Sequence, residues 1–325
     1  MKFVIFGPEA RVGVIQQSRI LDLEKAAQAL GGSAGVPQQH ISSAFISLRH
    51  LIEQGDRGLD LVRTVMEKAA GSDQPGLHVE LAGAKLHAPF PGRRFGLTGR
   101  NYADHVANAF TNMGKPITAE EVTAKSRLGR ARGFWVVDPP EGPGADVPYP
   151  SSSNGLFDYE GEVAIVLGKN GKRIKADRWR DHLWGTTLVI DWSVRSASLV
   201  ENTQPFYANK IFDGSKSLGP WIAVDEVDPS SCGVETHVNG QLRQRFNSRD
   251  MIHTFGELLE QMSEELTLHA GDVLSGGTGA GTATDSTIPR SDGSLPLDLF
   301  LKPGDTVEVS SPDLGVLNAR VVAGS

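Results

Sequence analysis

The first 85 residues combine short apolar runs with two stretches of helical spacing. Three short strands of a β-meander are expected, over residues 3–6, 12–15 and 19–23. After Pro37, apolar side chains recur at helical spacing and stop at Gly55: Ile41, Phe45, Leu48 and Ile52. A second helix is expected over residues 59–70, ending at Gly71. We therefore predict a small N-terminal α+β domain over residues 1–85.

From His87 onward, short apolar runs are separated by glycine and proline, which is typical of a β-rich domain. Thr118-Ala-Glu-Glu121 and Thr254-Phe-Gly-Glu257 are capping-box patterns that each predict a helix start. The second of these helices is expected to carry one apolar face, made of Leu258, Leu259, Met262 and Leu266. We expect residues 86–325 to form the main domain, and the whole chain to be a β-rich α+β protein.

Composition and charge narrow the class of protein. The net charge of −7 argues against a nucleic acid or an anionic membrane surface as a partner. Cys232 is the single cysteine, which excludes an intramolecular disulfide and fits a reducing compartment. No apolar run approaches the roughly 20 residues that span a bilayer, and the N-terminus lacks the organisation of a signal peptide. We expect a cytoplasmic protein.

Three carboxylates are the strongest candidates for chemistry. Residues 157–168 have strand character, so Glu160 and Glu162 share one face. Asp191 ends another apolar run. Neighbouring buried carboxylates repel each other unless a cation compensates, and Mg²⁺ accepts a few carboxylates while keeping waters that a substrate can displace. Spacing alone leaves two interpretations open, a metal site or a solvated strand face with Asp191 capping a turn.

A resemblance to a known family favours the metal site. Asp158-Tyr-Glu-Gly-Glu162-Val-Ala-Ile-Val-Leu-Gly-Lys169 resembles the metal-binding strand of the fumarylacetoacetate hydrolase family, and Ile190-Asp-Trp-Ser-Val-Arg195 resembles the site of its third metal carboxylate. The similarity continues in collinear order over roughly residues 95–320. It implies a mixed β-sandwich roll, often paired into homodimers. It also implies that Glu160, Glu162 and Asp191 bind Mg²⁺ or Mn²⁺.

The same resemblance implies a general base. Gly99-Arg-Asn-Tyr-Ala-Asp-His105-Val resembles the family's substrate-facing segment, and the ordinary pKa of histidine suits this role. In hydrolytic members a glutamate commonly lies one helical turn further on, where this chain has Asn108. Asparagine can orient an imidazole but offers no negative charge. Glu120 or Glu121 could substitute if their helix folds over the site.

Further departures surround the expected site. The family's Lys-Pro pair before the metal strand is replaced by residues 134–140, which contain no lysine, and its Thr-Gly-Thr-Pro loop reads Gly276-Gly-Thr278-Gly279. The basic run at residues 125–132 is either a solvated helix face or a cover over an anionic substrate. These changes spare the expected metal ligands and alter their surroundings, so we predict a changed substrate and leave a changed reaction open as an alternative.

The resemblance implies a hydrolase that cleaves a C–C bond in a small 2,4-dioxo acid, such as an acylpyruvate. His105 would deprotonate the attacking water, and Lys210 would stabilise the developing enolate beside the metal. The expected substrate contacts are Arg100, Tyr102, Thr278 and, with a structural role as the alternative, Arg195.

Two other hypotheses remain open. A lyase of the same family, dehydrating a 2-oxo-3-deoxy sugar acid or decarboxylating an oxaloacetate-like acid, keeps the metal and the enolate, and Asn108 favours it; tautomerisation of an oxo acid is a lesser variant. A non-catalytic, metal-dependent 2-oxo-acid-binding protein would account for the missing glutamate and lysine. The partner expected in every case is a small 2-oxo acid.

Overall fold

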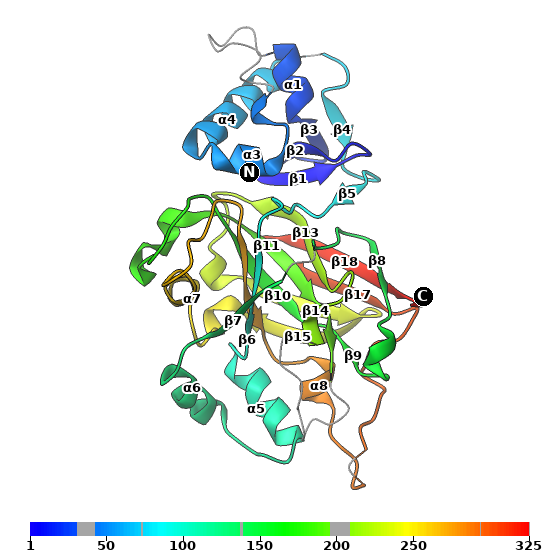
Figure 1. Cartoon of the computed structure of the whole chain (residues 1–325). Coiled ribbons are helices and arrows are strands. Elements are labelled where there is room, and N and C mark those ends of the chain that lie inside the picture. The colour runs from blue at the N-terminus through cyan, green and yellow to red at the C-terminus, as the bar shows by residue number, and fades with distance from the viewer. Residues whose placement is uncertain (31–42, 73, 137–138, 196–208, 293, 325) are drawn as a thin grey trace.

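A computed structural model describes residues 1–30, 43–72, 74–136, 139–195, 209–292 and 294–324 (Figure 1). Within them, eleven strands form one large sheet. Ten follow in the order β4 (His78–Glu80), β3 (Arg19–Asp22), β2 (Arg11–Gln16), β1 (Lys2–Phe6), β13 (Lys216–Ala223), β11 (Leu183–Asp191), β10 (Gly161–Leu167), β16 (Val273–Thr278), β6 (Phe95–Gly99) and β7 (Arg132–Val136), and β5 (Leu86–His87) pairs with β1.

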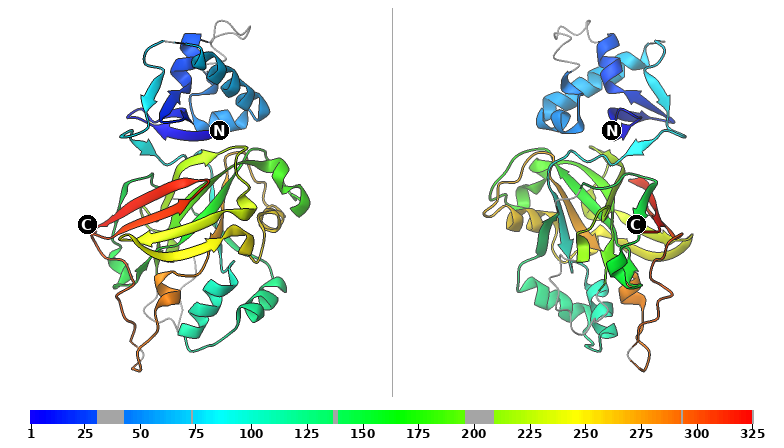
Figure 2. Two further views of the ribbon diagram at one scale, coloured as in Figure 1. Left: turned by 180° about the vertical axis from the view of Figure 1, so that it is seen from behind. Right: turned by 45° about the vertical axis from the view of Figure 1, so that its right-hand side comes forward.

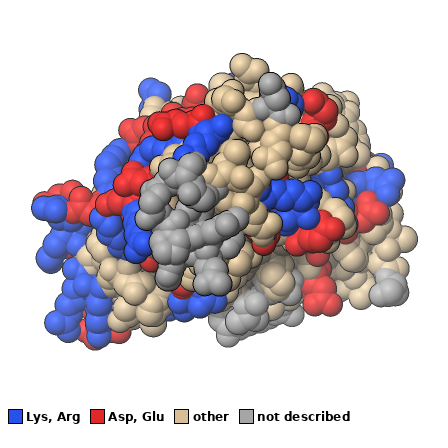
Figure 3. Space-filling view, turned by 90° about the horizontal axis from the view of Figure 1, so that it is seen from above, with Lys and Arg blue, Asp and Glu red and all other residues tan. Residues whose placement is uncertain are grey.

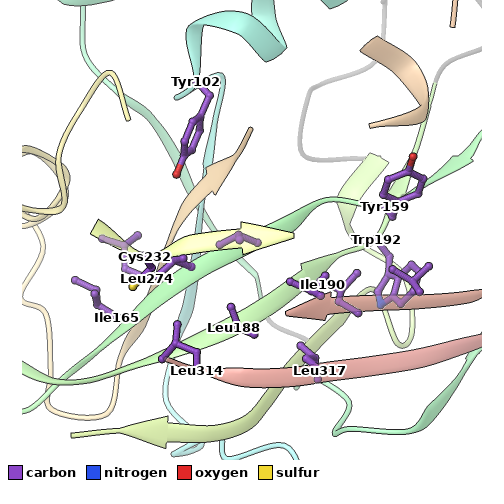
Figure 4. Packing of buried hydrophobic residues seen from close by; sticks show 14 of the residues in the cluster. Tyr102, Tyr159, Ile165, Leu188, Ile190, Trp192, Cys232, Leu274, Leu314 and Leu317 are labelled. Carbon is purple, nitrogen blue, oxygen red and sulfur yellow. The ribbon is translucent and has the colours of Figure 1, made fainter. Parts of the chain in front are cut away.

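A second sheet packs against the middle of the first. Its order is β15 (Gln241–Asn247), β14 (Gly233–Val238), β17 (Thr306–Ser311), β18 (Gly315–Val322) and β8 (Ala145–Pro148). The core between the two sheets includes Ile165, Leu188 and Ile190 from one sheet and Leu317 from the other (Figure 4). The β-rich α+β prediction is confirmed, with two stacked sheets as its centre.

The N-terminal residues form a unit at one end of the molecule (Figures 1 and 2). Its strands β1–β4 carry the helices α1 (Leu23–Leu30), α3 (Leu48–Glu53) and α4 (Asp56–Ala70). This unit continues the large sheet, because Lys2 pairs with Ala223 across β1 and β13. One apolar cluster also contains side chains from both parts, including Leu51, Val62, Val189 and Ile222. The division at residue 85 stays a prediction.

The first predicted helix is corrected by the structure. Pro37 and Ile41 lie outside the described residues. Further on, α3 begins only after Ser47, whose Oγ accepts a hydrogen bond from the His50 amide at 3.1 Å. Phe45 therefore precedes this helix rather than sharing it with Leu48. A serine side chain that caps an amide gives the backbone an alternative to a continuous helix, which apolar spacing alone does not reveal.

Both capping boxes form as predicted. Thr118 caps α6 (Ala119–Arg127) and Thr254 caps α7 (Phe255–Met262). The prediction that Leu266 belongs to the face of α7 is wrong, because the helix ends at Met262 and Leu266 is 39% exposed. The remaining helices are α5 (Ala103–Asn112) and the short α8 (Ala283–Ser286). α5 and α6 lie at the end of the molecule opposite the N-terminal unit (Figures 1 and 2).

Viewed from the end that carries the N-terminal unit, the surface shows no single dominant charge. Basic and acidic side chains are interspersed there (Figure 3), in keeping with a modest net charge of −7. Among the described residues, no helix combines the length and apolar character needed to span a membrane.

Candidate active site

Three buried carboxylates meet where two central strands end. Glu162 lies on β10, Glu160 directly precedes that strand, and Asp191 ends the neighbouring β11. The Asp191 amide donates to the Glu160 carbonyl at 2.9 Å, which fixes the two segments side by side. One carboxylate oxygen from each residue lies within 4.8 Å of the others. We call Glu160, Glu162 and Asp191 the acidic triad.

Three cations surround the acidic triad. Arg195 donates to Glu160 at 2.6 Å and to Asp158 at 2.9 Å. Lys210 Nζ bridges the Glu160 and Asp191 carboxylates at 2.5 and 2.6 Å. Lys216, a residue that the sequence did not single out, places its Nζ 3.0 Å from Asp191 Oδ1 and donates to the Lys210 carbonyl at 2.8 Å. Arg195 and Lys210 thus contact the triad directly.

The pKa values of two carboxylates of the acidic triad, Glu160 and Glu162, are shifted in opposite directions. Burial alone raises the pKa of Glu160, but the positive charges of Lys210 and Arg195 outweigh it and hold that pKa below its ordinary value. Burial and the negative charges of Asp191 and Glu160 raise the pKa of Glu162 well above its ordinary value. Burial also lowers the pKa of Lys216. The region around Glu162 is therefore short of positive charge.

The triad has the donor set of a hard divalent cation. The side chain of Glu162 has a single hydrogen-bond partner in the described part of the chain, the Ser275 hydroxyl. The buried Asp191 Oδ1 accepts no hydrogen bond of good geometry from these residues. Oxygen atoms that are buried, close together and incompletely paired suit Mg²⁺ or Mn²⁺, which prefer carboxylate ligands. The residues present therefore fit the predicted metal.

His105 is paired with a carboxylate that the sequence did not indicate. It lies in the first turn of α5, and its Nδ1 is 2.8 Å from Oδ2 of Asp285 on α8. Asp285 is 5% exposed, and its carboxylate also accepts the Gly281 amide at 3.0 Å. A carboxylate in this position orients the imidazole and stabilises its protonated form.

The expected partners of His105 do not fill that role. Asn108, Glu120 and Glu121 are exposed, and the Glu121 carboxylate caps its own helix by accepting the Thr118 amide at 3.0 Å. The suggestion that Glu120 or Glu121 substitutes is therefore wrong. A local signal for Asp285 did exist, because Thr282-Ala-Thr-Asp285 has the spacing of a helix cap and Thr282 Oγ1 accepts the Asp285 amide at 3.3 Å.

Asp158 joins α8 to the acidic triad. Its fully buried carboxylate accepts the Ala283 and Thr284 amides at 2.8 and 3.0 Å, and the Thr284 hydroxyl at 2.8 Å. The same carboxylate accepts from Arg195, which holds Glu160. One side chain therefore fixes both the helix that carries Asp285 and the cation beside the triad.

A cavity of about 100 Å³ is lined by Glu160 of the acidic triad and by His105. The predicted site residues that line it come from five segments, namely Arg100, His105, Glu160, Arg195, Lys210 and Thr278, whereas Glu162 and Asp191 do not line it. The Thr278 hydroxyl donates to the Gly161 carbonyl at 2.8 Å and accepts from Gln244 at the same distance, so it is held in place. Val106, Ala109 and Phe110 of α5, with Met113 directly after the helix, form an apolar side of the cavity.

Tyr102 lies elsewhere. Its ring belongs to the buried core (Figure 4). The ring packs edge-on against Phe246, with ring centroids 5.1 Å apart. It is not among the described residues that line the cavity, and its hydroxyl has no hydrogen-bond partner among them. The side chain predicted to contact substrate therefore packs beneath the site.

Comparison with known proteins gives consistent relatives. The chain is 30% identical over 317 residues, 95% of this chain and 94% of the relative, to oxaloacetate tautomerase YisK of Bacillus subtilis. A 5-carboxymethyl-2-hydroxymuconate delta-isomerase structure from Mycobacterium smegmatis is 30% identical with a TM-score of 0.57, covering 77% of this chain and 84% of that one. A fumarylacetoacetate hydrolase from Exiguobacterium antarcticum is 25% identical with a TM-score of 0.69, covering 99% of both.

These relatives share the fold predicted from the sequence motifs. The sequence pattern described as fumarylacetoacetate (FAA) hydrolase C-terminal matches residues 96–322, which contain the acidic triad, its three cations and the His105–Asp285 pair. The resemblance inferred from the metal strand and the collinear motifs is thereby confirmed. The chain belongs to the fumarylacetoacetate hydrolase family.

Proposed function

We propose that the protein is a metal-dependent hydrolase that cleaves the C–C bond of a small 2,4-dioxo acid of the acylpyruvate class. The His105–Asp285 pair is the observation that carries this proposal. The absence of a carboxylate partner for the base was the main argument for a lyase or a non-catalytic protein, and Asp285 removes it. The proposed homodimer and cytoplasmic location rest on the family resemblance and the composition.

The charge of the site supports an anionic ligand. Four carboxylates, Asp158 and the acidic triad, face three cations, Arg195, Lys210 and Lys216, and leave one net negative charge. A divalent ion would turn this into one net positive charge, which matches the carboxylate of a 2-oxo acid. When bound to the triad, Mg²⁺ or Mn²⁺ would supply a Lewis acid for the 2-oxo group.

The side chains of the cavity fit the remaining steps. His105 takes a proton from water, whose oxygen adds to the 4-oxo carbon, and Asp285 stabilises the resulting imidazolium. The C3–C4 bond then breaks, and its electron pair forms the enolate of pyruvate beside the Lys210 ammonium. His105 returns the proton to C3. The products are pyruvate and the carboxylic acid of the acyl group.

Tautomerisation of oxaloacetate is the second candidate. It is favoured by the similarity to YisK, named an oxaloacetate tautomerase, which spans 95% of this chain and so includes the N-terminal unit. The same His105–Asp285 pair would move a proton between C3 and the enol oxygen with no bond cleavage. The apolar side of the cavity on α5 favours an acyl group over a second carboxylate, so we place this candidate second.

Product analysis distinguishes the candidates. Chelator-treated protein is incubated with acetylpyruvate or with oxaloacetate, with and without added Mg²⁺, and followed by NMR and by enol absorbance. Pyruvate and acetate formed only with Mg²⁺, and lost in His105→Ala, are expected. If the protein speeds the loss of enol absorbance from oxaloacetate over the rate without protein, and does not cleave acetylpyruvate, the protein is a tautomerase and not a hydrolase. Pyruvate released from oxaloacetate above the rate of free Mg²⁺ would assign a decarboxylase.

A further inference from the structure

A second cavity of about 310 Å³ adjoins the one that Glu160 and His105 line. The two share Gly99, Arg100, Val106 and Phe110 as lining residues. At this junction the Arg100 guanidinium stacks on Phe110, 5.3 Å from the ring centroid. A ligand that extends beyond the first cavity along α5 therefore reaches the second one.

The outer wall of the second cavity is α6 and the loop that follows it. This wall is fastened to α7, because Arg127 pairs with Glu257 at 2.5 Å and Arg130 pairs with Glu264. The Ala131 amide also donates to Gln261 at 2.7 Å. Part of the basic run at residues 125–132 thus holds α6 and the following loop against α7 and the residues after it. Lys125 and Arg130 both line the cavity, and Arg130, like Arg127, is neutralised by its glutamate partner.

Two side chains that line this cavity, Lys125 and His253, have no polar partner among the described residues. Lys125 is exposed and forms no ion pair or hydrogen bond with those residues, and the imidazole of His253 forms none either, although this residue is only 6% exposed. Asn101 holds the backbone of His253 with hydrogen bonds of 2.8 and 2.9 Å, which fixes its position. A largely buried imidazole without a protein partner, as in His253, is costly unless a ligand or a water in the cavity pairs with it.

The cavity also has an apolar side. Its lining includes Val106 and Phe110 of α5, Val122 of α6 and Ile117 shortly before it, besides the polar side chains of Arg100, Ser126 and Arg130. This combination of apolar and cationic groups suits a chain that is apolar in its middle and anionic at its end.

We propose that the second cavity is a subsite for the distal end of an extended 2-oxo acid, with an apolar chain along α5 and a terminal carboxylate at Lys125 and His253. The inference rests on the proposed function only for the 2-oxo acid head group. It assigns a role to α6, which the chemistry at the triad does not use. It also predicts selection by chain length, since short acids end before the polar pair.

Binding of uncleavable 2-oxo acids tests the subsite without turnover. Calorimetry with the Mg²⁺-loaded full chain compares 2-oxo diacids of five to eight carbons with the monoacids of equal length. We expect no preference for 2-oxoglutarate over 2-oxopentanoate, and about tenfold tighter binding of the diacid at seven or eight carbons, where one charge-assisted contact is gained. Lys125→Met should remove that preference and leave pyruvate binding unchanged.

Lys115→Met is the matched control, because it removes an exposed cation shortly before α6 that does not line the cavity. It should keep the diacid preference, and His253→Phe, which fills the space with an apolar ring, should reduce it. Equal binding of diacids and monoacids at every length overturns the subsite, as does a preference that survives both Lys125→Met and His253→Phe. Failure of pyruvate and all longer acids to bind would instead contradict the proposed function.

Discussion

His105 Nδ1 and Asp285 Oδ2 lie 2.8 Å apart although 180 residues separate them in the chain. The contact joins α5 to α8, and Asn112 strengthens it by donating to the Asp285 carbonyl at 2.9 Å. The base and its carboxylate are thus held by two different elements. This arrangement differs from a histidine and glutamate one turn apart on a single helix, and it explains how the chain can use asparagine at position 108.

Replacing Asp285 tests that relationship. We expect Asp285→Asn to lower kcat by about 10²- to 10⁴-fold, because the amide neither stabilises the imidazolium nor fixes its tautomer. Asn108→Ala is the control and should stay within about twofold, as expected for an exposed surface position. Steady-state kinetics on acetylpyruvate and oxaloacetate measure both. A severe loss of kcat in Asn108→Ala with none in Asp285→Asn would show that residue 108, and not Asp285, is the partner that His105 needs.

Glu162→Gln tests the acidic triad by thermal unfolding. Mg²⁺ or Mn²⁺ should raise the Tm of the wild type, since a ligand of the native state adds about 2.7 kcal/mol at 100 times its Kd. The variant should lose most of this shift. Its metal-free form should melt above the metal-free wild type, because Glu162 is buried beside Asp191 and Glu160. Glu120→Gln, at an exposed position, is the control, and an equal metal shift in all three proteins would exclude the triad as the metal site.

Asp158→Asn should destabilise the fold and the site together. The variant leaves Arg195 partly unpaired and weakens the cap of α8, so we expect a loss of about 3–5 kcal/mol in the free energy of unfolding. Asp146→Asn breaks the exposed pair with Arg320 and should cost about 1 kcal/mol or less. Urea unfolding followed by tryptophan fluorescence compares them. Similar losses of unfolding free energy in the two variants would show that the contacts of Asp158 stabilise the fold no more than an exposed ion pair does.

Cys232 should be unreactive in the native protein. Burial, with the nearby charges of Asp313 and Asp228, raises the pKa of its thiol to about 12, so the thiolate is scarce at neutral pH. Its Sγ also donates to the Asp228 carbonyl at 3.3 Å. Thiol titration at pH 8 should find no reactive group before unfolding and one afterwards. Rapid modification of the native protein would show that this part of the core opens.

The predictions that succeeded depended on local pattern. Alternation placed Glu160 and Glu162 together, and the apolar run before Asp191 placed it at a strand end. The capping boxes at Thr118 and Thr254 needed only four residues each. In each case the physical cause lies within a few residues, so a single sequence contains it.

The features that escaped prediction join distant segments. Asp285 reaches His105 through the placement of α8, which depends on Asp158 in another part of the chain. Lys2 pairs with Ala223, so strands of the N-terminal unit continue the large sheet, a long-range pairing that the sequence did not indicate. Tyr102 was expected at the substrate because of its neighbours in sequence, and its burial follows from the register that pairs it with Met251. Tertiary packing decides such contacts, and no local pattern reports them.

Exchange of the C3 protons of pyruvate tests the central claim most directly, because the proposed cleavage and the tautomerisation both move a proton between that carbon and His105. Pyruvate is incubated in D₂O with the Mg²⁺-loaded protein, and loss of its methyl signal is followed by proton NMR. We predict exchange above the rate of free Mg²⁺, absent in His105→Ala and in chelator-treated protein and reduced in Asp285→Asn. Exchange at equal rates in wild type and His105→Ala, or no exchange of bound pyruvate, would contradict the account.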